Sequence, residues 1–578
     1  MVPRYSRRLL TIVGVAVALV LLLTACAPAA TSPAPAPAPA QPAPTSAPQA
    51  PPIGSIAIAT AIPLPTPGTG SPAPVPSPSS RTPPSASSAP KKGGILVRPI
   101  KNETGTLDPI LSITYSTLDQ VGPVYDTLLL MDGKFQVRPD LATSWSQLDN
   151  QTYVFKLRSG VRFHNIPPVN GRELTPEDVK YTLERIGFRT KGLKPAARYL
   201  EFELLEKVEV LDRTTVQVKL REPFAPFITY VAEAFNGIVP REYADLEATG
   251  GFTGRAIGTG PFMLESYARD VQTVLARNPN YWERDIPHLD KIRVPVIPDI
   301  AARMAAFRVR QADFVEPDNV EQLRSLQKTN PDAQTVRKPA VMYLLYFNEA
   351  KPPFDDVRVR KALFKAIDRK QLIDAVAGGD GFVPSVIPQG GWSLPEENLG
   401  TYYKRDTNEA RRLLEAAGYK NNLTFEMLGS NRQRPASDAM AVLTQQFKEI
   451  GVTFKATVLE HVVFNERYSK KKDYQAMSFA QGIRVDPDQQ LYLYWVTSGI
   501  YNYSDATLDK LAAEQRRETN LDKRRQVLWQ AQRRILDEAH AAPLWTSWLN
   551  EMVQPYVRNY ESPTVYHQPL LRYVSLDK

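Results

Sequence analysis

Two short segments of the chain alternate apolar and polar residues with a period of two, as half-buried strands do. In residues 153–158 every second side chain is large and apolar, and Gly160 then offers a turn into a second apolar pair at 161 and 163. This pattern predicts a hairpin over residues 153–163. Residues 214–220 repeat the alternation, with Val216, Val218 and Leu220 on one side of a further strand.

Other segments place apolar residues three and four positions apart, which predicts amphipathic helices. Thr175 is a favourable N-cap, Pro176 suits the first helical position, and a buried stripe follows at 179, 183 and 186. The same spacing runs through residues 355–374. Residues 406–419 begin with an aspartate three positions before a glutamate, a helix-capping pattern. They end at Gly418, a residue that readily adopts the left-handed backbone conformation that terminates a helix. Strands and helices are therefore mixed throughout, and we expect a mixed α/β (α+β) fold.

The first 25 residues have the organisation of a secretory signal. Arginines precede an apolar run over residues 9–23, and small residues follow up to Cys26, the chain's single cysteine. At about 1.5 Å per residue the run covers roughly 22 Å, short of the ~30 Å apolar layer of a bilayer, so a permanent membrane span is the weaker interpretation. The sequence before Cys26 resembles a bacterial lipobox, which implies cleavage there and attachment of lipid to Cys26. Two acyl chains would give stable anchoring.

Residues 26–93 are predicted to be a disordered tether. Residues 27–90 hold 20 of the 51 prolines, interleaved with Ala, Ser and Thr, and contain no acidic residue. Such a segment cannot bury enough apolar surface to offset its ordering entropy. In polyproline II form it would be a semi-rigid spacer.

Acidic residues and ordinary composition begin at residue 91, which leaves enough chain for two or three packed domains. Only four of the 70 Lys and Arg precede this point, so the body carries a formal charge of just +5. That small excess does not indicate a nucleic-acid partner. The body has no cysteine for disulfides or thiolate metal sites, and its five histidines are scattered. We expect no metal, no cofactor and no enzymatic activity.

Several motifs, taken in order, resemble the peptide/nickel-type (oligopeptide/dipeptide-binding) extracellular solute-binding proteins of ABC importers. They are "TLDP" at 106–109, "LATSWSQLDNQTYVFKLRSGVRFHN" with "GRELTPEDVKYTLER" at 141–185, "GTGPF" at 258–262, "NPNYW" at 278–282, "FNEAKPPFDDVRVRKALFKAIDR" at 347–369 and "DPD" at 486–488. The resemblance covers essentially all of residues 94–578.

The resemblance implies a two-lobe periplasmic-binding-protein-like fold with a hinge and an extra subdomain. Lobe I is expected at 94–135, 256–339 and 545–578, with the subdomain at 136–255 and lobe II at 340–544. The chain would cross between lobes near Ala340 and return near Leu544. Function is implied as well: a monomeric, lipid-anchored, extracytoplasmic binding protein closes on its ligand by hinge motion and delivers it to membrane permease subunits.

One departure from the family bears on the ligand. In peptide-binding relatives an aspartate four residues before the proline of "DPD" captures the ligand's α-ammonium group. Here that position is Ile483, and Arg484 follows it. An isoleucine cannot pair with an ammonium group and an arginine repels one, so we expect weak binding of free-amine dipeptides.

Aromatic residues and the segment around Ile483 are the expected ligand contacts. Aromatic rings supply stacking surface, and an arginine fork suits a carboxylate or phosphate. The candidates are Tyr115, Tyr343, Tyr346, Trp392, Gln481, Gly482, Ile483 and Arg484. For Tyr343 and Trp392 a place in the hydrophobic core is an equally good interpretation.

Two alternatives remain open from the sequence. A lipid-anchored hydrolase of external polymer would also be exported, although the chain lacks a G-x-S-x-G elbow, a P-loop and a paired zinc-ligand motif. A receptor or chaperone variant of the same fold would not feed a permease. As ligand we expect a peptide-like molecule or an oligosaccharide.

Overall fold

The computed structural model describes residues 90–112, 114–132, 136–188, 195–248, 254–388, 390–497, 499–561 and 571–578. The expected signal, Cys26 and most of the expected tether lie outside the described residues. The described body has three main sheets and two large hydrophobic cores, and we use the cores to define lobe I and lobe II. Within this part of the chain, none of the helices combines the length and apolar character needed to span a bilayer.

Lobe I contains two four-stranded sheets that share one hydrophobic core. The first has the order β1 (Ile95–Val97), β10 (Lys291–Pro295), β9 (Gln272–Arg277) and β8 (Phe262–Ala268), with β1 parallel to β10. The second is antiparallel, in the order β4 (Ala142–Gln147), β5 (Thr152–Leu157), β7 (Thr215–Leu220) and β6 (Leu205–Asp212). Short ladders join β2 (Leu129–Met131) to β3 (Val137–Pro139), and β18 (Val557–Arg558) to β19 (Ser575–Leu576).

Helices complete lobe I at α1 (Tyr115–Val121), α2 (Pro176–Gly187), α3 (Phe227–Tyr230), α4 (Tyr243–Ala248), α5 (Ile300–Arg308) and α6 (Val320–Thr329). The N-terminus of α2 is the expected one. Thr175 and Asp178 form a reciprocal capping box, and Pro176 is the first helical residue. This anchors α2 against β6 and β7 of the second sheet.

Lobe II is built on a mixed sheet with the order β11 (Phe314–Val315), β17 (Ala541–Val553), β12 (Gln334–Phe347), β16 (Ala476–Gly482), β14 (Leu423–Ser430) and β15 (Val452–Leu459), with β13 (Gly381–Phe382) paired to β17. Its helices are α7 (Val357–Ala366), α8 (Arg369–Ala377), α9 (Glu396–Tyr403), α10 (Thr407–Ala416), α11 (Arg434–Lys448), α12 (His461–Asn465), α13 (Pro487–Tyr494), α14 (Ala506–Arg517) and α15 (Leu521–Asp537).

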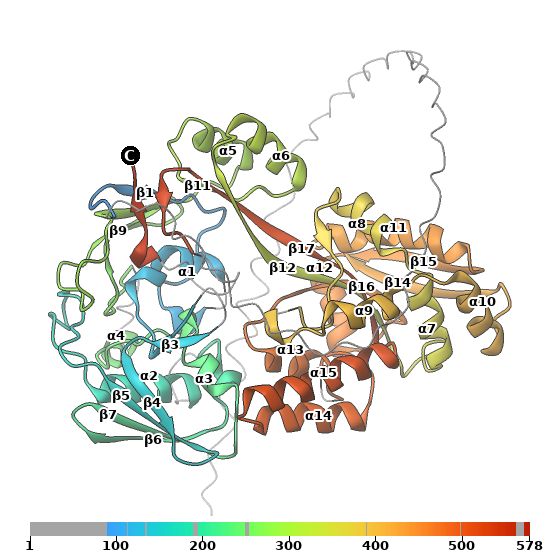
Figure 1. Ribbon diagram of the computed structural model, residues 1–578, viewed down its shortest axis with the longest axis horizontal. Coiled ribbons are helices and arrows are strands. Elements are labelled where there is room, and N and C mark those ends of the chain that lie inside the picture. The colour runs from blue at the N-terminus through green and yellow to red at the C-terminus, as the bar shows by residue number, and fades with distance from the viewer. Residues whose placement is uncertain are drawn as a thin grey trace, which may run out of the picture. The chain divides into compact units, whose positions relative to one another are not determined.

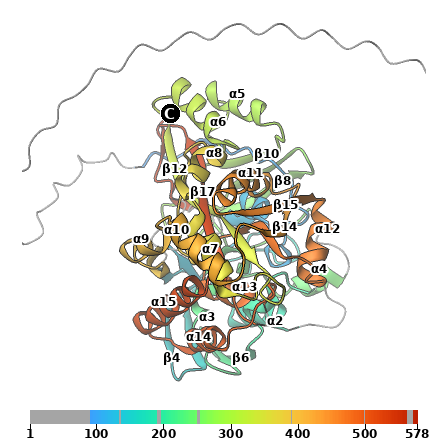
Figure 2. The same cartoon turned by 90° about the vertical axis from the view of Figure 1, so that its right-hand side faces the viewer.

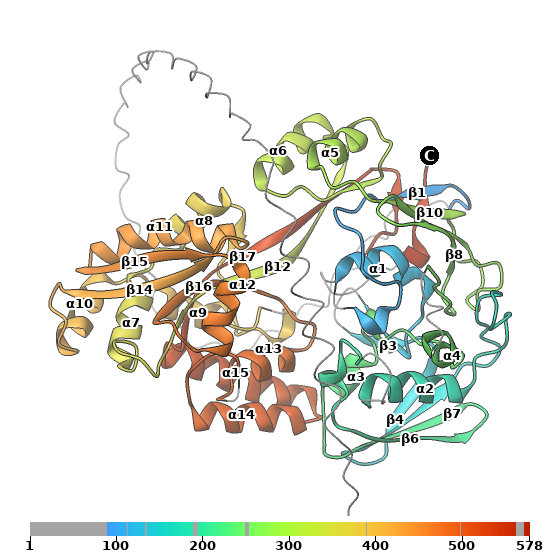
Figure 3. The ribbon, with the colours of Figure 1, turned by 180° about the vertical axis from the view of Figure 1, so that it is seen from behind.

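The long strands β12 and β17 connect the lobes (Figure 1). They pair antiparallel from Gln334↔Val553 at one end to Tyr346↔Ala541 at the other. The register shifts between Pro339 and Val341, at the position where we expected the chain to cross. Figure 2 shows the two strands side by side, and Figure 3 shows the crossing between the lobes from behind. A two-strand connection of this kind permits one lobe to rotate against the other.

One local expectation was wrong. Strand β5 forms, but it pairs with β4 and β7, while the segment after Gly160 makes only the single bridge Arg162↔Glu173. β5 is therefore a central strand flanked on both edges, which alternation alone does not reveal. The apolar stripe expected from residue 359 onward lies on α7, and a second helix, α8, follows because Asp368 caps it by accepting a hydrogen bond from the Gln371 backbone N–H.

The "GTGPF" motif has a packing role. A Cβ at Gly258 would lie 2.2 Å from the backbone oxygen of Val124, and one at Gly260 would lie 2.5 Å from that of Pro123. The Gly260 backbone N–H donates to the Val124 oxygen at 2.9 Å. Only glycine permits this close approach of two backbone segments.

Candidate functional site

A cavity of about 560 Å³ lies between the lobes, and we call it the charged cavity. Lobe I contributes α1, the turn before β6 and α3, while lobe II contributes the segment after β16 together with α13 and α14. Its lining is Tyr115, Ala197, Arg198, Leu200, Glu201, Glu203, Tyr230, Arg484, Asp488, Gln489, Tyr492, Leu493, Gly499, Ile500 and Arg516. Three arginines and three carboxylates stand in this wall, and several of them pair with one another, as Arg516 does with Glu203 and Asp488.

The lobe I side of the charged cavity holds a buried ion cluster. Arg198 pairs with Glu201 and, at 3.2 Å, with Glu233, whose side chain is fully buried behind the wall. Burial and, after it, the neighbouring Glu201 raise the pKa of Glu233 to about 8, although Arg198 acts in the opposite direction. Arg484 of lobe II also lowers this pKa.

The "DPD" motif starts α13 and faces the cleft. Asp486 is the N-cap and accepts from the Asp488 backbone N–H at 2.8 Å, with Pro487 at the first helical position. The Asp486 carboxylate also accepts from buried Arg524 at 2.5 and 3.0 Å. The motif thereby holds Asp488 at the surface where the two lobes meet.

Direct contacts join the lobes beside the charged cavity. Tyr230 donates to Asp488 at 3.3 Å, and Gln489 donates to Glu201 at 2.6 Å. Figures 1 and 2 show α3 next to α14 at this contact. The described structure is thus a state in which the lobes touch.

Arg516 on α14 makes the densest set of these contacts. Its guanidinium lies 3.1 Å from Asp488 in its own lobe and 3.4 Å from Glu203 in lobe I. It also lies over the Phe224 ring of lobe I at 4.7 Å. The Arg516 backbone oxygen accepts from the Ala225 N–H at 2.6 Å.

A second cavity, of about 670 Å³, also lies between the lobes, and we call it the aromatic cavity. Its lobe I wall comes from β2–β3, β4, β5 and α3, and its lobe II wall comes from the segment at 391–392, the residues before α13, and α15. The lining residues are Met131, Gln136, Val137, Trp145, Ser146, Gln147, Tyr153, Ala225, Ile228, Thr229, Gly391, Trp392, Val485, Asp486, Thr519, Leu521, Arg524 and Arg525.

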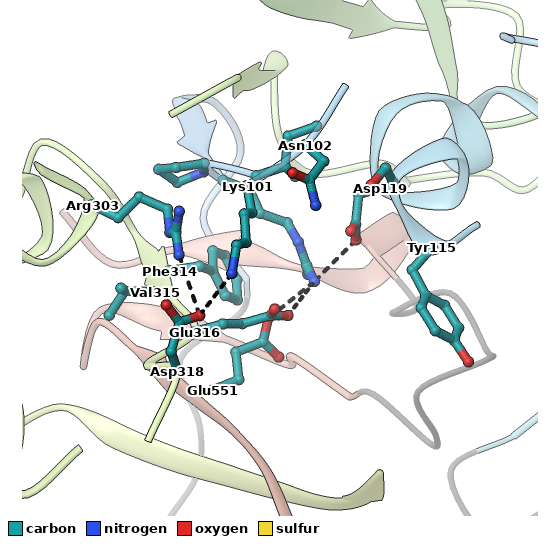
Figure 4. Close-up of a pocket in the computed structure, with 14 residues that line it drawn as sticks. Lys101, Asn102, Tyr115, Asp119, Arg303, Phe314, Val315, Glu316, Asp318 and Glu551 are labelled. Carbon is teal, nitrogen blue, oxygen red and sulfur yellow. Dashed lines mark hydrogen bonds and ion pairs between the residues drawn. The ribbon is translucent and has the colours of Figure 1, made fainter. Parts of the chain in front are cut away.

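A third, smaller cavity of about 190 Å³ lies where β1 of lobe I approaches β11 and β17, and Figure 4 shows the ion pairs in its wall. Arg98 lies 3.0 Å from Glu551 and 3.2 Å from Asp119. Burial by itself raises the pKa of Glu551, but Arg98 and Lys338 outweigh it and hold that pKa below its ordinary value. This cluster ties β17 and β12, the two connecting strands, to lobe I.

The structure separates the sequence-predicted ligand residues. Tyr115 and Arg484 line the charged cavity, and Trp392 lines the aromatic one. Tyr343 is 8% exposed and its ring stacks on Trp545 at 4.1 Å, while Tyr346 is fully buried in the lobe II core.

The remaining candidates lie beside the crossing strands. Gln481 and Gly482 pair with β12, and the Ile483 backbone N–H donates to the Ala340 oxygen at 3.3 Å. Gln481 and Ile483 are buried, at 2% and 6% exposure. They shape the end of β16 immediately before Arg484.

Sequence reasoning missed the lobe I wall and Arg516. Arg198 and Glu201 stand three positions apart, a spacing that is ordinary for a solvated helix surface. The sequence indicated Asp488 only as the last residue of the "DPD" motif. No local signal indicates that these groups meet, because the contact joins segments almost 300 residues apart.

The described residues do not suggest a metal centre. Their His, Cys, Asp and Glu side chains nowhere gather in threes in a way that could hold a metal ion. His540 is a satisfied structural residue, since its ring nitrogens lie 2.7 Å from Glu349 and 3.1 Å from Asp505. His567 lies outside the described residues.

Comparison with known proteins decides the family. Residues 136–503 match the family model described as bacterial extracellular solute-binding proteins, family 5. The chain belongs to this family. As a family 5 solute-binding protein it is the extracytoplasmic substrate-binding component of an ABC importer, and its relatives are binding proteins, not enzymes.

Relatives and solved structures cover most of this solute-binding protein. Heme-binding protein A of Haemophilus influenzae is 29% identical over 472 residues, which is 77% of this chain and 85% of the relative. Di/tripeptide-binding protein 1 of Pseudomonas aeruginosa is 28% identical over 456 residues, covering 74% and 84%.

Two solved structures share the fold. HbpA2 from Haemophilus parasuis superposes with a TM-score of 0.74 at 24% identity, over 84% of this chain and all of the other. DppA from Helicobacter pylori, in complex with the peptide STSA, has a TM-score of 0.67 at 24% identity, over 84% and 99%. The expected two-lobe periplasmic-binding-protein fold is therefore confirmed.

Proposed function

We propose that this protein captures a peptide-like ligand in the charged cavity and delivers it to a membrane permease when the lobes close. The observation that carries the proposal is the composition of this cavity, whose wall is supplied by both lobes and holds charges of both signs. A ligand that touches both walls favours the state in which the lobes meet. Relatives named as di/tripeptide-binding and dipeptide-binding proteins support a peptide-like ligand over an oligosaccharide.

The ligand's carboxylate, or a blocked N-terminus, is proposed to face Arg484. Arg484 is half-buried in the cavity wall and follows Ile483, which offers no carboxylate for an ammonium group. A guanidinium can hold a carboxylate through two parallel hydrogen bonds. We therefore propose that N-acetylated or acidic peptides bind better than dipeptides with a free amine.

Calorimetric titration tests both parts of this proposal. The full chain is titrated with a free-amine dipeptide, with its N-acetylated form and with an oligosaccharide. We expect the acetylated peptide to bind at least about tenfold more tightly than the free amine, which corresponds to about 1.4 kcal/mol. Submicromolar affinity for the free dipeptide would contradict the role given to Ile483 and Arg484. Saturable binding of the oligosaccharide alone would overturn the peptide assignment.

We further propose that Cys26 carries the lipid anchor and that the protein works as a monomer beside its permease subunits. A tether on the membrane keeps the binding protein at a high effective concentration near its partner. Mass spectrometry of the membrane-extracted protein tests this. The expected product begins at Cys26 and carries a diacylglyceryl group, whereas an unmodified Cys26 would contradict the anchor.

A further inference from the structure

The aromatic cavity has its own chemistry, distinct from that of the charged cavity. Trp145 and Tyr153 come from lobe I, and Trp392 comes from lobe II. Apolar side chains fill much of the remaining wall on both sides, among them Ile228, Val485 and Leu521. Such faces favour rings, which stack or meet edge to face and bury a large apolar area.

The charged groups in this wall already have partners. The buried Arg524 guanidinium and the Asp486 carboxylate form two hydrogen bonds with each other. Arg525 donates to Asp522 at 2.7 Å and to the Gly391 backbone oxygen at 3.0 Å. An ionic ligand group would have to displace these bonds, so a charged ligand gains little here.

The polar groups of lobe I in this wall are neutral. Gln147 donates from its side-chain nitrogen to the Tyr153 hydroxyl at 3.3 Å. Burial raises the pKa of Tyr153 to about 12, although Arg524 acts in the opposite direction, so the phenol stays protonated near neutral pH. The lobe I part of the wall therefore combines aromatic faces with uncharged hydrogen-bonding groups.

The two cavities share no lining residue. Ile228 and Thr229 line the aromatic cavity while the next residue, Tyr230, lines the charged cavity. On lobe II, Asp486 belongs to the first cavity and Asp488 to the second. The hydrogen bond from Tyr230 of lobe I to Asp488 of lobe II joins these two segments.

We propose that the aromatic cavity is a second binding site, which takes an uncharged ligand carrying an aromatic ring. The proposal goes beyond the peptide capture assigned to the charged cavity. Its volume of about 670 Å³ is in the range of small-molecule sites. Because both lobes supply its rings, a ligand there favours the state in which the lobes touch.

The test is calorimetric titration of the full chain with N-acetyl-L-tryptophan amide, an uncharged aromatic probe. We expect saturable binding with a submillimolar dissociation constant, as ligands of this size reach. N-acetyl-L-leucine amide should bind about tenfold more weakly, because it lacks the ring. Absence of saturable heat with the tryptophan amide would overturn the proposal.

Substitutions in the wall test whether the probe binds in the aromatic cavity. Trp145→Leu removes a ring from the wall and should weaken probe binding about tenfold. Leu521→Trp fills the cavity from a position that is 61% exposed, so the fold tolerates it, and should also weaken binding. The matched control is Trp548→Leu, a half-buried tryptophan on β17 that packs against Phe382 outside this cavity. The proposal fails if Leu521→Trp leaves probe binding unchanged, or if Trp548→Leu weakens it equally.

Titrating the same protein with the probe and with the peptides distinguishes a failure of this proposal from a failure of the proposed function. The probe carries no charge, so its binding does not require the arginines of the charged cavity. A protein that binds the probe but no peptide would retain the second site and lose the peptide assignment. A protein that binds an acetylated peptide but not the probe would give the reverse result.

Discussion

Arg516 offers the sharpest test of how the two lobes are held together. Arg516→Met keeps most of the apolar stem but removes the guanidinium, which pairs with Glu203 at 3.4 Å and lies over Phe224 at 4.7 Å. The backbone bond to Ala225 survives the substitution, because it uses the Arg516 carbonyl oxygen. The variant therefore reports on the side-chain part of the lobe contact.

The magnitude follows from these two interactions. Glu203 is 28% exposed, so its ion pair contributes about 0.2–1 kcal/mol, and the contact with the Phe224 ring adds about 0.5–1 kcal/mol. Their loss should shift the equilibrium away from the touching state by about 0.7–2 kcal/mol. That corresponds to a factor of about 3–30 in the ratio of touching to separated lobes.

Distance measurement by electron paramagnetic resonance checks this shift. Cys26 is replaced by serine, and spin labels are placed on cysteines at Leu211 in lobe I and Val458 in lobe II, which are 53% and 51% exposed. We expect Arg516→Met, without ligand, to enlarge a population with a longer distance between the labels.

The neighbouring Arg517 provides the control. It pairs with Glu222 at 2.9 Å across the same contact, but both side chains are largely exposed, at 59% and 42%. Such surface pairs contribute little, so Arg517→Met should leave the distance distribution near that of the parent protein. An unchanged distribution for Arg516→Met, or an equal shift for both variants, would refute the reasoning.

Three further substitutions test the interior. Burial and a neighbouring carboxylate raise the pKa of Glu233 from 4.5 to about 8, so the ionised form is disfavoured in the folded protein and stability falls as pH rises between those values. Glu233→Gln should raise the melting temperature relative to the parent at about pH 8 more than at about pH 5, and a pH-independent difference would contradict this. Arg524→Leu leaves Asp486 buried without its cation and should cost about 3–5 kcal/mol in urea unfolding. A loss of unfolding free energy below about 1 kcal/mol would contradict the interpretation of Arg524 and Asp486 as a buried ion pair. Gly258→Ala places a Cβ 2.2 Å from the Val124 oxygen and should lower stability by about 1–3 kcal/mol, whereas an unchanged melting temperature would argue against the packing role.

Local signals anticipated much of the secondary structure. The capping box at Thr175 and the left-handed Gly418 after α10 are as expected, because caps and stops depend on a few neighbouring residues. The sequence-based prediction was wrong where the pairing of a strand depends on residues far away in the chain. The alternation that predicted a hairpin after Tyr153 contains no information about which strands flank β5.

The candidate site was foreseen only in part. The resemblance to the family predicted Tyr115 and Arg484 as ligand contacts, and both line the charged cavity. The same reasoning expected Tyr346 beside the ligand, but its ring lies 4.0 Å from that of Tyr501 in the lobe II core. An aromatic residue on a strand can face either a core or a cleft, and only the packing of the neighbouring elements distinguishes the two.

By itself the sequence determined that strands and helices are mixed, where many of them begin and end, and that the body carries almost no excess charge. These properties follow from short-range periodicity, capping and composition. The tertiary structure decided that Arg198 and Glu201 of one lobe line a cavity with Arg484 of the other, and that Trp145 and Trp392 share a second cavity. These groups are far apart in the chain, and their charges and rings interact only because β12 and β17 bring the two lobes into contact.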